Sequence, residues 1–484
     1  MTNRKLLALC LILILILILC GCQENTPPAT EPATEPITVA TEPDTEPTEP
    51  VWAGYSGPKD AYIYYYSEGR DREWEEDVLY FVNSHFTDNQ LLRNRMFLVN
   101  LPGLQTDSRN FYNESIHSAL LQAVNALIPE IENLTDDEMY YRIQMMSALF
   151  RDAHTRSYGG NEAIFPILFL SVPEDDGFAY YAVVVPKENE DLLYTELTAI
   201  NQIPLEEVVE RMRGYACYEN EYGFARSLGY GGYDYDFLSM ACALEATGIC
   251  PVGEDQVTYT LMDSDGTSHD LTVETYISFP FSRCTGITPA DALPVPYWYG
   301  VAENYWYTTD LAEETLYVRI SSFEVEAQET YMDLARALTV ESNNTDHFHK
   351  IIVDLRGNGG GYQAEGWRAI ITTLAAMEFD QFYVLVDGGS YSCSMLFASE
   401  VKFHIPETIF AGTPTGEAPG FFAAIYDSDY IMPNCRWEFT VPTQYYQTFE
   451  ANEENALVPE ILIWQTLEDY IACRDVVLEY VLAQ

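Results

Sequence analysis

The sequence predicts an α/β protein whose C-terminal core consists of layered strands and helices. Three patterns support this class. Short apolar strands alternate with helices over the C-terminal part of the chain, two pairs of strands flank a short helix between residues 166 and 276, and the region before residue 165 is largely helical in pattern. With 484 residues, the chain is long enough for two or three domains of about 150 residues each.

The N-terminus has the pattern of an export signal. Arg4 and Lys5 precede an apolar run that ends at Cys20, which is short for a membrane span but suits the apolar region of a signal peptide. The run ends in Leu-Cys-Gly-Cys, which resembles the bacterial lipobox, so residues 1–21 are expected to be removed and Cys22 to be lipidated. An uncleaved membrane anchor is the alternative. Both interpretations export the rest of the chain, and lipidation predicts a location outside the cytoplasm on the bacterial cell membrane.

Residues 22–52 are expected to be a disordered, extended linker. The triplet Thr-Glu-Pro occurs five times in it, and sequence rich in proline and in charges of one sign stays extended, at about 3.1 Å per residue. The repeat is a low-complexity spacer and not a solenoid. The linker therefore separates the lipid from the folded part of the chain, which is expected to begin at residue 53.

The net charge excludes several classes of partner. The chain has 24 basic and 75 acidic residues, and its formal charge of −51 repels nucleic acids and the surface of anionic membranes. There is no CxxC pair and no HExxH motif, so neither a metal nor another cofactor is expected. Seven cysteines lie beyond the linker. Export permits disulfides, but the odd number and irregular spacing favour mostly buried free thiols.

One helix of the N-terminal region is marked by its start signal. Thr135 and Glu138 form a capping box, apolar residues follow at helical spacing, and the helix is expected to end near Arg151. The other elements follow from apolar periodicity and turn residues. Strands are expected at 164–172, 178–185, 256–262, 269–274, 316–320, 351–355, 383–386 and 408–411, and helices at 328–337 and 366–377. Two further helices are expected, one that follows 197–205 and ends at residue 212, and one that the serine cluster 390–394 opens and that ends near residue 400.

Two turns in the C-terminal part have features that a nucleophile and an oxyanion-binding site require. A glycine-rich turn, 357–361, follows a buried strand, and glycine lets backbone N–H groups approach a ligand because no Cβ intervenes. A serine cluster, 390–394, follows the next strand and opens a helix, where N–H groups are unpaired and the helix dipole is positive. A nucleophile needs such exposure, and a developing oxyanion needs two N–H donors.

These two turns together resemble the carboxyl-terminal processing, or tail-specific, serine peptidase family, to which the tricorn core protease belongs. The strand that begins at Leu316 resembles the strand that opens the catalytic core of this family, and the stretch 200–204 resembles a loop of its PDZ-like module, with Gln202 in place of glycine. The resemblance implies a peptide or protein substrate. It implies a helical region over 53–165, a degenerate PDZ-like module over 166–276 and a crotonase-like (ClpP/crotonase) catalytic core over 277–484.

The resemblance also implies roles for individual residues. Alignment on the glycines before the serine cluster makes Ser392 the nucleophile, with the backbone N–H groups of Cys393 and Gly360 as the oxyanion hole. Met395 stands where the family has a glutamate. One branch of the family carries a lysine base in a loop equivalent to 413–418, and here this loop contains no lysine.

A histidine is the expected base instead. The tricorn-like branch has a histidine just after an early helix, and Asp152-Ala153-His154-Thr155 resembles that motif. Histidine, with an ordinary pKa of about 6.5, can act as a base at neutral pH. Glu453 lies in a stretch that resembles the acidic segment of this branch and is expected to orient the imidazole. Lys402 is excluded as the base because it lies at the far end of the predicted helix.

The sequence therefore predicts a cell-surface serine peptidase in which Ser392 attacks the substrate carbonyl and His154 takes its proton. Two alternatives stay open. Met395, Gln202 and Ala456 depart from the family pattern, which is consistent with an inactive scaffold that binds peptides in the same cleft. The second alternative is an esterase with a non-peptide substrate on the same core. The sequence does not indicate an oligomeric state.

Overall fold

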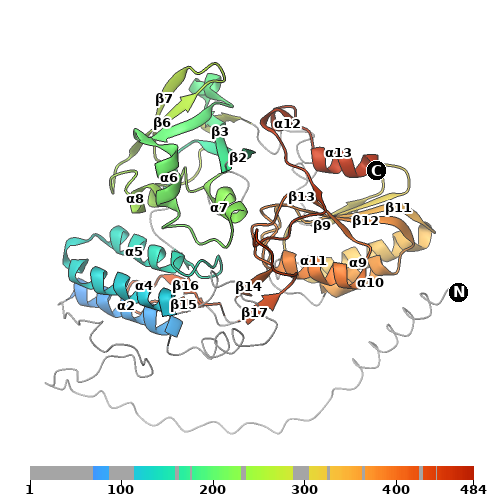
Figure 1. The fold of residues 1–484 in the computed structure, drawn as a ribbon, viewed down its shortest axis with the longest axis horizontal. Coiled ribbons are helices and arrows are strands. Elements are labelled where there is room, and N and C mark those ends of the chain that lie inside the picture. The colour runs from blue at the N-terminus through green and yellow to red at the C-terminus, as the bar shows by residue number, and fades with distance from the viewer. Residues whose placement is uncertain are drawn as a thin grey trace, which may run out of the picture.

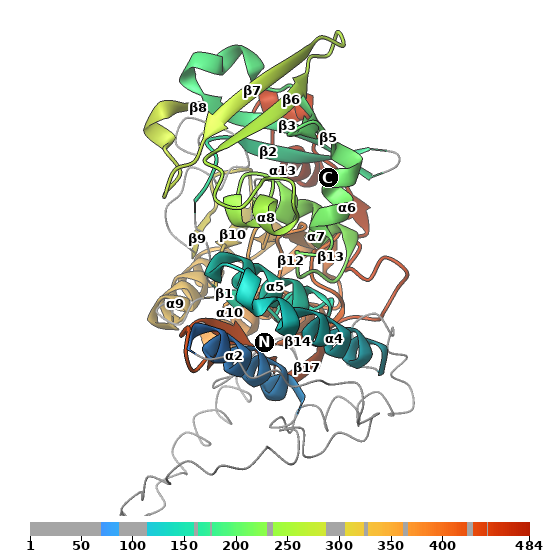
Figure 2. The same ribbon diagram turned by 90° about the vertical axis from the view of Figure 1, so that its left-hand side faces the viewer.

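The computed structural model describes most of the chain beyond the linker. The described residues are 69–86, 114–158, 163–174, 177–229, 236–286, 305–323, 328–361, 366–423, 429–442 and 444–484. The predicted signal peptide, Cys22 and the linker lie outside them. The described residues form a helical part, a part built on a seven-stranded sheet and a part built on a six-stranded sheet (Figures 1 and 2). The predicted α/β class is confirmed.

The helical part contains the predicted capped helix. Its elements are α2 (Arg70–Phe86), α4 (Glu114–Leu127), the 3-10 helix η3 (Ile128–Asn133) and α5 (Asp136–Ala148). Thr135 and Glu138 form the capping box of α5. A small sheet of β1 (Ser157–Tyr158), β16 (Glu438–Thr440) and β15 (Asp429–Ile431) packs on these helices. This region is therefore not purely helical, because two strands from near the C-terminus complete its core.

The second part is an antiparallel sheet with helices on it. Its strands are β2 (Leu168–Glu174), β3 (Gly177–Pro186), β4 (Glu196–Ile200), β5 (Ile203–Pro204), β6 (Gln256–Met262), β7 (Ser268–Glu274) and β8 (Cys284–Gly286), in the order β2-β3-β4-β6-β7, with β5 on β4 and β8 on β3. Its helices are η4 (Lys187–Leu192), α6 (Leu205–Met212), α7 (Glu221–Leu228) and α8 (Ala241–Ala246). Both predicted hairpins are confirmed.

The third part has a six-stranded sheet in the order β18-β13-β12-β11-β10-β9, parallel except for β9. The strands are β9 (Tyr305–Thr308), β10 (Thr315–Ile320), β11 (Phe348–Asp354), β12 (Phe379–Val386), β13 (Ile409–Gly412) and β18 (Ile461–Leu462). Helices α9 (Gln328–Asn344), α10 (Gly366–Ala375) and α11 (Cys393–His404) cover one face, and α13 (Val476–Ala483) covers the other (Figure 1). Helix α12 (Leu467–Ile471) and the pair β14 (Gly420–Ala423) and β17 (Gln444–Gln447) complete this part.

The parallel pairing of β11 and β12 brings the two predicted turns together. Asp354, the last residue of β11, pairs with Leu385 of β12. Because the carboxyl ends of parallel strands meet at one edge of a sheet, the glycine-rich turn and the serine cluster emerge side by side. The alternation of strands and helices in this half of the chain therefore positions both turns at one place.

Two further findings concern the cysteines and the helices of the described residues. All seven cysteines of this part of the chain have free thiols, and four of them, Cys242, Cys250, Cys284 and Cys393, are buried. The prediction of mostly buried free thiols agrees with this. Among the described residues, no helix has both the length and the apolar character that a membrane span requires.

Candidate active site

Ser392 occupies a strained turn between β12 and α11. It is the residue before the first turn of α11, and its backbone dihedrals are φ 52° and ψ −117°, a conformation that normally favours glycine. Strain of this kind costs of the order of 1–3 kcal/mol and persists only where the surroundings hold the residue in place. Here its amide donates a 2.6 Å hydrogen bond to Oε2 of Glu417. The turn presents the Ser392 hydroxyl at the start of a helix.

His154 lies within hydrogen-bonding distance of that hydroxyl. Its Nε2 is 3.0 Å from Oγ of Ser392, although the two residues are 238 positions apart in the chain. Asp152 shapes the loop after α5, because its carboxylate accepts hydrogen bonds from the His154 amide and from the hydroxyl of Thr155. The ring of Phe421, in β14, stacks on the imidazole at 5.8 Å between centroids. The structure thus brings together the two residues that the sequence predicts as base and nucleophile.

The imidazole is neutral in this environment. Burial, with a smaller contribution from the positive charge of Arg156, lowers the pKa of His154 to about 3. Glu417 lies next to the ring but does not offset this effect, because burial raises the pKa of the Glu417 carboxyl well above its ordinary value. A neutral imidazole is the form that can accept a proton from the serine hydroxyl.

Glu417 is the acid that stands behind the imidazole. Its Oε1 lies 3.7 Å from Nδ1 of His154, and its side chain is fully buried. Among the described residues, neither of these two atoms has a hydrogen-bond partner. A distance of 3.7 Å is too long for a hydrogen bond, but catalytic hydrogen bonds are often long before substrate binds. A small closing movement would satisfy both atoms.

The expectation for Glu453 needs correction. Glu453 is exposed, and it forms no ion pair with His154 among the described residues. The carboxylate beside the imidazole is Glu417, which lies in the loop 413–418. Sequence reasoning tested this loop only for a lysine and therefore missed the glutamate in it. The absence of the lysine was itself the signal, since another ionisable residue occupies the same loop.

A second carboxyl from the seven-stranded part reaches the same place. Glu219 comes just before α7, and its Oε2 accepts a 2.8 Å hydrogen bond from the amide of Ala418. Its side chain is hydrogen-bonded to that of Glu417, and burial raises the pKa of Glu219 to about 8. The acid–base side of the site therefore draws on the helical part, the seven-stranded part and the loop 413–418.

One group of side chains has metal-like spacing. Among the described residues, atoms of Asp152, His154 and Glu219 lie within 4.8 Å of one another. The Asp152 carboxylate already accepts two hydrogen bonds, Glu219 accepts one from Ala418, and Nε2 of His154 faces Ser392. These contacts engage both oxygens of Asp152, Oε2 of Glu219 and Nε2 of His154, and of these side chains they leave Nδ1 of His154, which faces Glu417, without a hydrogen bond to any described residue.

The predicted oxyanion donors adjoin the nucleophile but are not equivalent. Gly360 has φ 96°, and a Cβ placed on it would lie 2.6 Å from Cβ of Ser392 and 3.0 Å from N of Cys393, so only glycine fits. Its N–H donates to Oδ1 of Asn358 at 2.9 Å. The Cys393 N–H has no acceptor among the described residues. Cys393 therefore offers a ready donor, whereas the Gly360 donor is engaged by Asn358.

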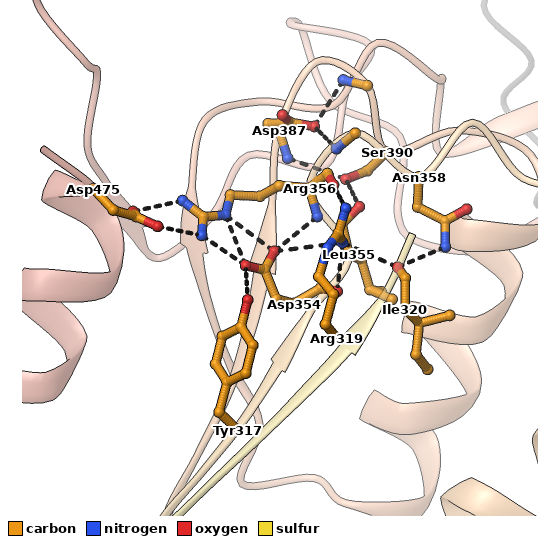
Figure 3. Close-up of polar contacts among 12 residues, drawn as sticks. Tyr317, Arg319, Ile320, Asp354, Leu355, Arg356, Asn358, Asp387, Ser390 and Asp475 are labelled. Atoms are coloured by element: carbon orange, nitrogen blue, oxygen red, sulfur yellow. Dashed lines mark hydrogen bonds and ion pairs between the residues drawn. The ribbon is translucent and has the colours of Figure 1, made fainter. Parts of the chain in front are cut away.

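A buried polar network holds both turns in place (Figure 3). Arg356 forms ion pairs with Asp354 at 2.6 Å and with Asp475 at 2.7 Å, and all three side chains are buried. Asp387 accepts the N–H groups of Gly357 and Gly389, which ties the glycine-rich turn to the serine turn. Asp354 and Arg356 thus hold the glycine-rich turn in its conformation.

Lys402 and Met395 lie in other surroundings. The ammonium group of Lys402 donates to the carbonyl oxygen of Thr408 and lies 3.5 Å from Glu460. Both contacts are at the C-terminal end of α11, away from Ser392 at its start. Met395, at the position of the family glutamate, is fully buried in the core beneath the sheet. Lys402 is therefore not paired with the nucleophile, as the sequence predicts.

Comparison with known proteins relates these features to a family. Residues 314–381 match the family model of peptidase family S41. Mature CPAF shares 12% sequence identity and a TM-score of 0.51 with this chain, over 85% of this chain and 96% of CPAF, so the folds are similar. Two further structures match: the photosystem II D1 C-terminal processing protease (12% identity, TM-score 0.34, 77% and 92% of the two chains) and the tricorn protease (13%, 0.38, 85% and 36%). No curated protein matches the sequence.

Proposed function

We propose that this chain is a serine-type peptidase of the tail-specific, S41-like kind, and that it cleaves peptide bonds with Ser392 as nucleophile and His154 as general base. The observation that carries the proposal is the 3.0 Å distance between Nε2 of His154 and Oγ of Ser392. A base must lie within hydrogen-bonding reach of the proton it takes, and this distance meets that requirement.

The proposed reaction follows from these positions. Ser392 Oγ attacks the carbonyl carbon while Nε2 of His154 takes the hydroxyl proton, which it then gives to the leaving amine. The Cys393 N–H stabilises the oxyanion, and the Gly360 N–H joins it when it leaves Asn358. Glu417 closes on Nδ1 of His154 and stabilises the imidazolium. A water molecule then releases the acyl group by the same steps in reverse.

The finer description of the fold also belongs to the proposal. We assign the third part, within 277–484, to a crotonase-like catalytic core and the second part, within 166–276, to a degenerate PDZ-like module. The parallel sheet with helices on both faces supports the first assignment. The strand–loop–helix unit formed by β4, β5 and α6, around Gln202, supports the second.

Location outside the cytoplasm is a separate proposal that rests on the N-terminal sequence. The proposal is that Cys22 carries a lipid that anchors the mature protein to the bacterial cell membrane. The mature protein should then partition into detergent, and Cys22→Ala should release or mislocalise it. Intact mass spectrometry that finds Met1 in the membrane form would contradict lipidation and would support an uncleaved anchor.

Hydrolysis of an unfolded protein substrate tests the peptidase proposal. The wild-type protein is expected to cleave the substrate, and Ser392→Ala is expected to abolish cleavage. Ser394→Ala is the matched control: the Ser394 hydroxyl is buried without a hydrogen-bond partner among the described residues, so its removal should leave cleavage intact. Hydrolysis of esters without hydrolysis of peptides would support the esterase alternative. Failure to hydrolyse either substrate would support the peptide-binding scaffold.

A further inference from the structure

We propose that Glu219 is a positioning residue for this reaction: it shares one proton with Glu417, and the pair presents its single negative charge to His154 when the imidazole takes the proton of Ser392. This inference rests on the proposed roles of Ser392 and His154. It adds Glu219, from the seven-stranded part of the molecule, to Ser392, His154 and Glu417, and the sequence does not associate Glu219 with catalysis.

The contact between the two carboxyl groups carries the inference. Glu219 and Glu417 are both buried and meet beside His154: Glu219 accepts the N–H of Ala418, the residue after Glu417, and one of its oxygens lies within 4.8 Å of the imidazole, from which Glu417 is 3.7 Å away. A side-chain hydrogen bond between the two carboxyl groups shifts the pKa of each. Ionised carboxylates only accept hydrogen bonds, so a bond between two carboxyl groups requires a proton on one of them. Two carboxyl groups in hydrogen-bonding contact in a buried site cannot both stay negatively charged, as in the carboxyl pairs of aspartic proteases. The pair therefore holds at least one proton.

Backbone contacts favour one proton over two. The Ala418 amide donates to Oε2 of Glu219 at 2.8 Å, and the Ser392 amide donates to Oε2 of Glu417 at 2.6 Å. Hydrogen bonds of this kind stabilise the charged form of a carboxyl. Burial alone would neutralise both groups, and the two N–H donors oppose it. We infer a pair with a single proton and a single negative charge.

The groups around the pair are consistent with one proton and one negative charge on it. Asp152 faces the pair from the loop after α5, His154 lies beside Glu417, and Tyr391 of the serine turn lies near both carboxyl groups. The repulsion from Asp152 adds to the cost of a second charge on the pair. Arg156 lies near His154, and its positive charge disfavours a protonated imidazole before the reaction begins.

The pair explains how a neutral resting imidazole can become positive during the reaction. As the proton of Ser392 moves to Nε2 of His154, the shared proton moves to the Glu219 carboxyl, and the negative charge settles on Glu417. No proton enters or leaves the site in this step. The charge on Glu417 then lies 3.7 Å or less from Nδ1, where it stabilises the imidazolium.

Glu219→Gln tests the pair, with the pH dependence of Ser392 labelling by a fluorophosphonate probe as the readout. Glutamine cannot hold the shared proton but can donate an N–H to Glu417, which then stays ionised to lower pH. The pKa of His154 should rise. The fall of the labelling rate at low pH (the acid limb of the profile), which follows protonation of the imidazole, should therefore move to higher pH. We expect a rate at least about threefold lower than wild type on that limb, corresponding to a shift of about half a pH unit, and a similar rate on the plateau.

Glu378→Gln is the matched control. Glu378 is exposed and precedes the opposite end of β12 from the serine turn, so its substitution should leave the profile unchanged. A Glu219→Gln variant that labels with the wild-type profile, or that loses rate equally at all pH values, would overturn the proposal and leave Glu219 a structural residue. A chelator should not alter the wild-type profile. If it does, a cation bound to Asp152, His154 and Glu219 accounts for the pH dependence instead.

Two further measurements test the shared proton independently of the proposed peptidase function. If the wild-type protein does not label at all, the proposed function fails. An NMR titration of His154 then still shows whether Glu219→Gln raises its pKa, as the shared proton requires. If Glu219→Gln does not fold, infrared spectroscopy of the wild-type protein decides. A protonated carboxyl band at neutral pH that Glu417→Gln removes is expected, and a band that is absent, or that Glu417→Gln leaves unchanged, would overturn the proposal.

Discussion

The two sides of the site are held in different ways. On the nucleophile side, the glycine-rich turn and the serine turn are tied by the network of Arg356, Asp354, Asp475 and Asp387, in which ion pairs are short and backbone N–H groups are accepted (Figure 3). On the acid–base side, Nδ1 of His154 and Oε1 of Glu417 face each other at 3.7 Å without partners among the described residues. The charged side chains that frame the nucleophile are all paired, whereas two facing atoms on the acid–base side are not.

This difference indicates what each side contributes. A nucleophile held in a strained conformation needs a rigid frame, because small displacements of the reacting atoms are costly in rate. An acid–base pair must change its charge and hydrogen bonds during the reaction. We therefore expect substitutions in the Arg356 network to act mainly on stability, and substitutions around His154 to act on turnover and its pH dependence.

The largest effect on turnover among the residues around His154 is expected from His154→Ala. Loss of a general base lowers kcat by about 10² to 10⁴-fold, whereas KM should change little because the imidazole faces the nucleophile. Steady-state kinetics on a peptide substrate measure both constants. His347→Ala is the control, since His347 is exposed and pairs with Asp380. A His154→Ala variant with near-wild-type kcat would require another base.

The next effect concerns the frame. Asp475→Ala leaves the buried guanidinium of Arg356 with one of its two acid partners missing, and breaking a buried ion pair costs about 3–5 kcal/mol of unfolding free energy. Arg474→Ala removes a neighbouring exposed ion pair and should lower the melting temperature much less. Denaturant unfolding of both variants measures the contrast. Equal losses would show that the network is not the frame that we describe.

A smaller effect on kcat separates the two candidate acids. Glu417→Gln keeps an oxygen for the Ser392 amide but removes the charge that stabilises the imidazolium, so kcat should fall by at least about tenfold, or about 1.4 kcal/mol. Glu453→Gln, on the surface, should have near-wild-type kcat. The reverse order of these two variants would restore the sequence-based choice of Glu453.

The smallest effect is on stability as a function of pH. Burial raises the pKa of Glu219 to about 8 and raises that of Glu417 as well, so the folded pair keeps its shared proton, which the carboxyls of the unfolded state release above about pH 4.3. Stability from this group is therefore present at low pH and is lost as pH rises between these values. The melting temperature of Glu219→Gln relative to wild type should accordingly increase over this range. A difference that does not vary with pH would contradict the raised pKa.

Much of the nucleophile side could be predicted from the sequence, and much of the acid–base side could not. The turns at 357–361 and 390–394 follow buried strands that are adjacent in the sheet, so local patterns were enough to bring them together. His154 was found through its motif after α5. Glu417 and Glu219 were missed because what singles them out among 75 acidic residues is their burial beside the imidazole, and this depends on the packing of three parts of the chain. Glu453 was chosen from a segment that the structure leaves exposed.

Covalent labelling decides whether His154 activates Ser392. The wild-type protein is treated with a fluorophosphonate probe, digested, and searched by mass spectrometry for the modified residue. We expect a single adduct on Ser392 that forms far more slowly in His154→Ala. An adduct on another residue, or equal labelling rates for the two proteins, would contradict it.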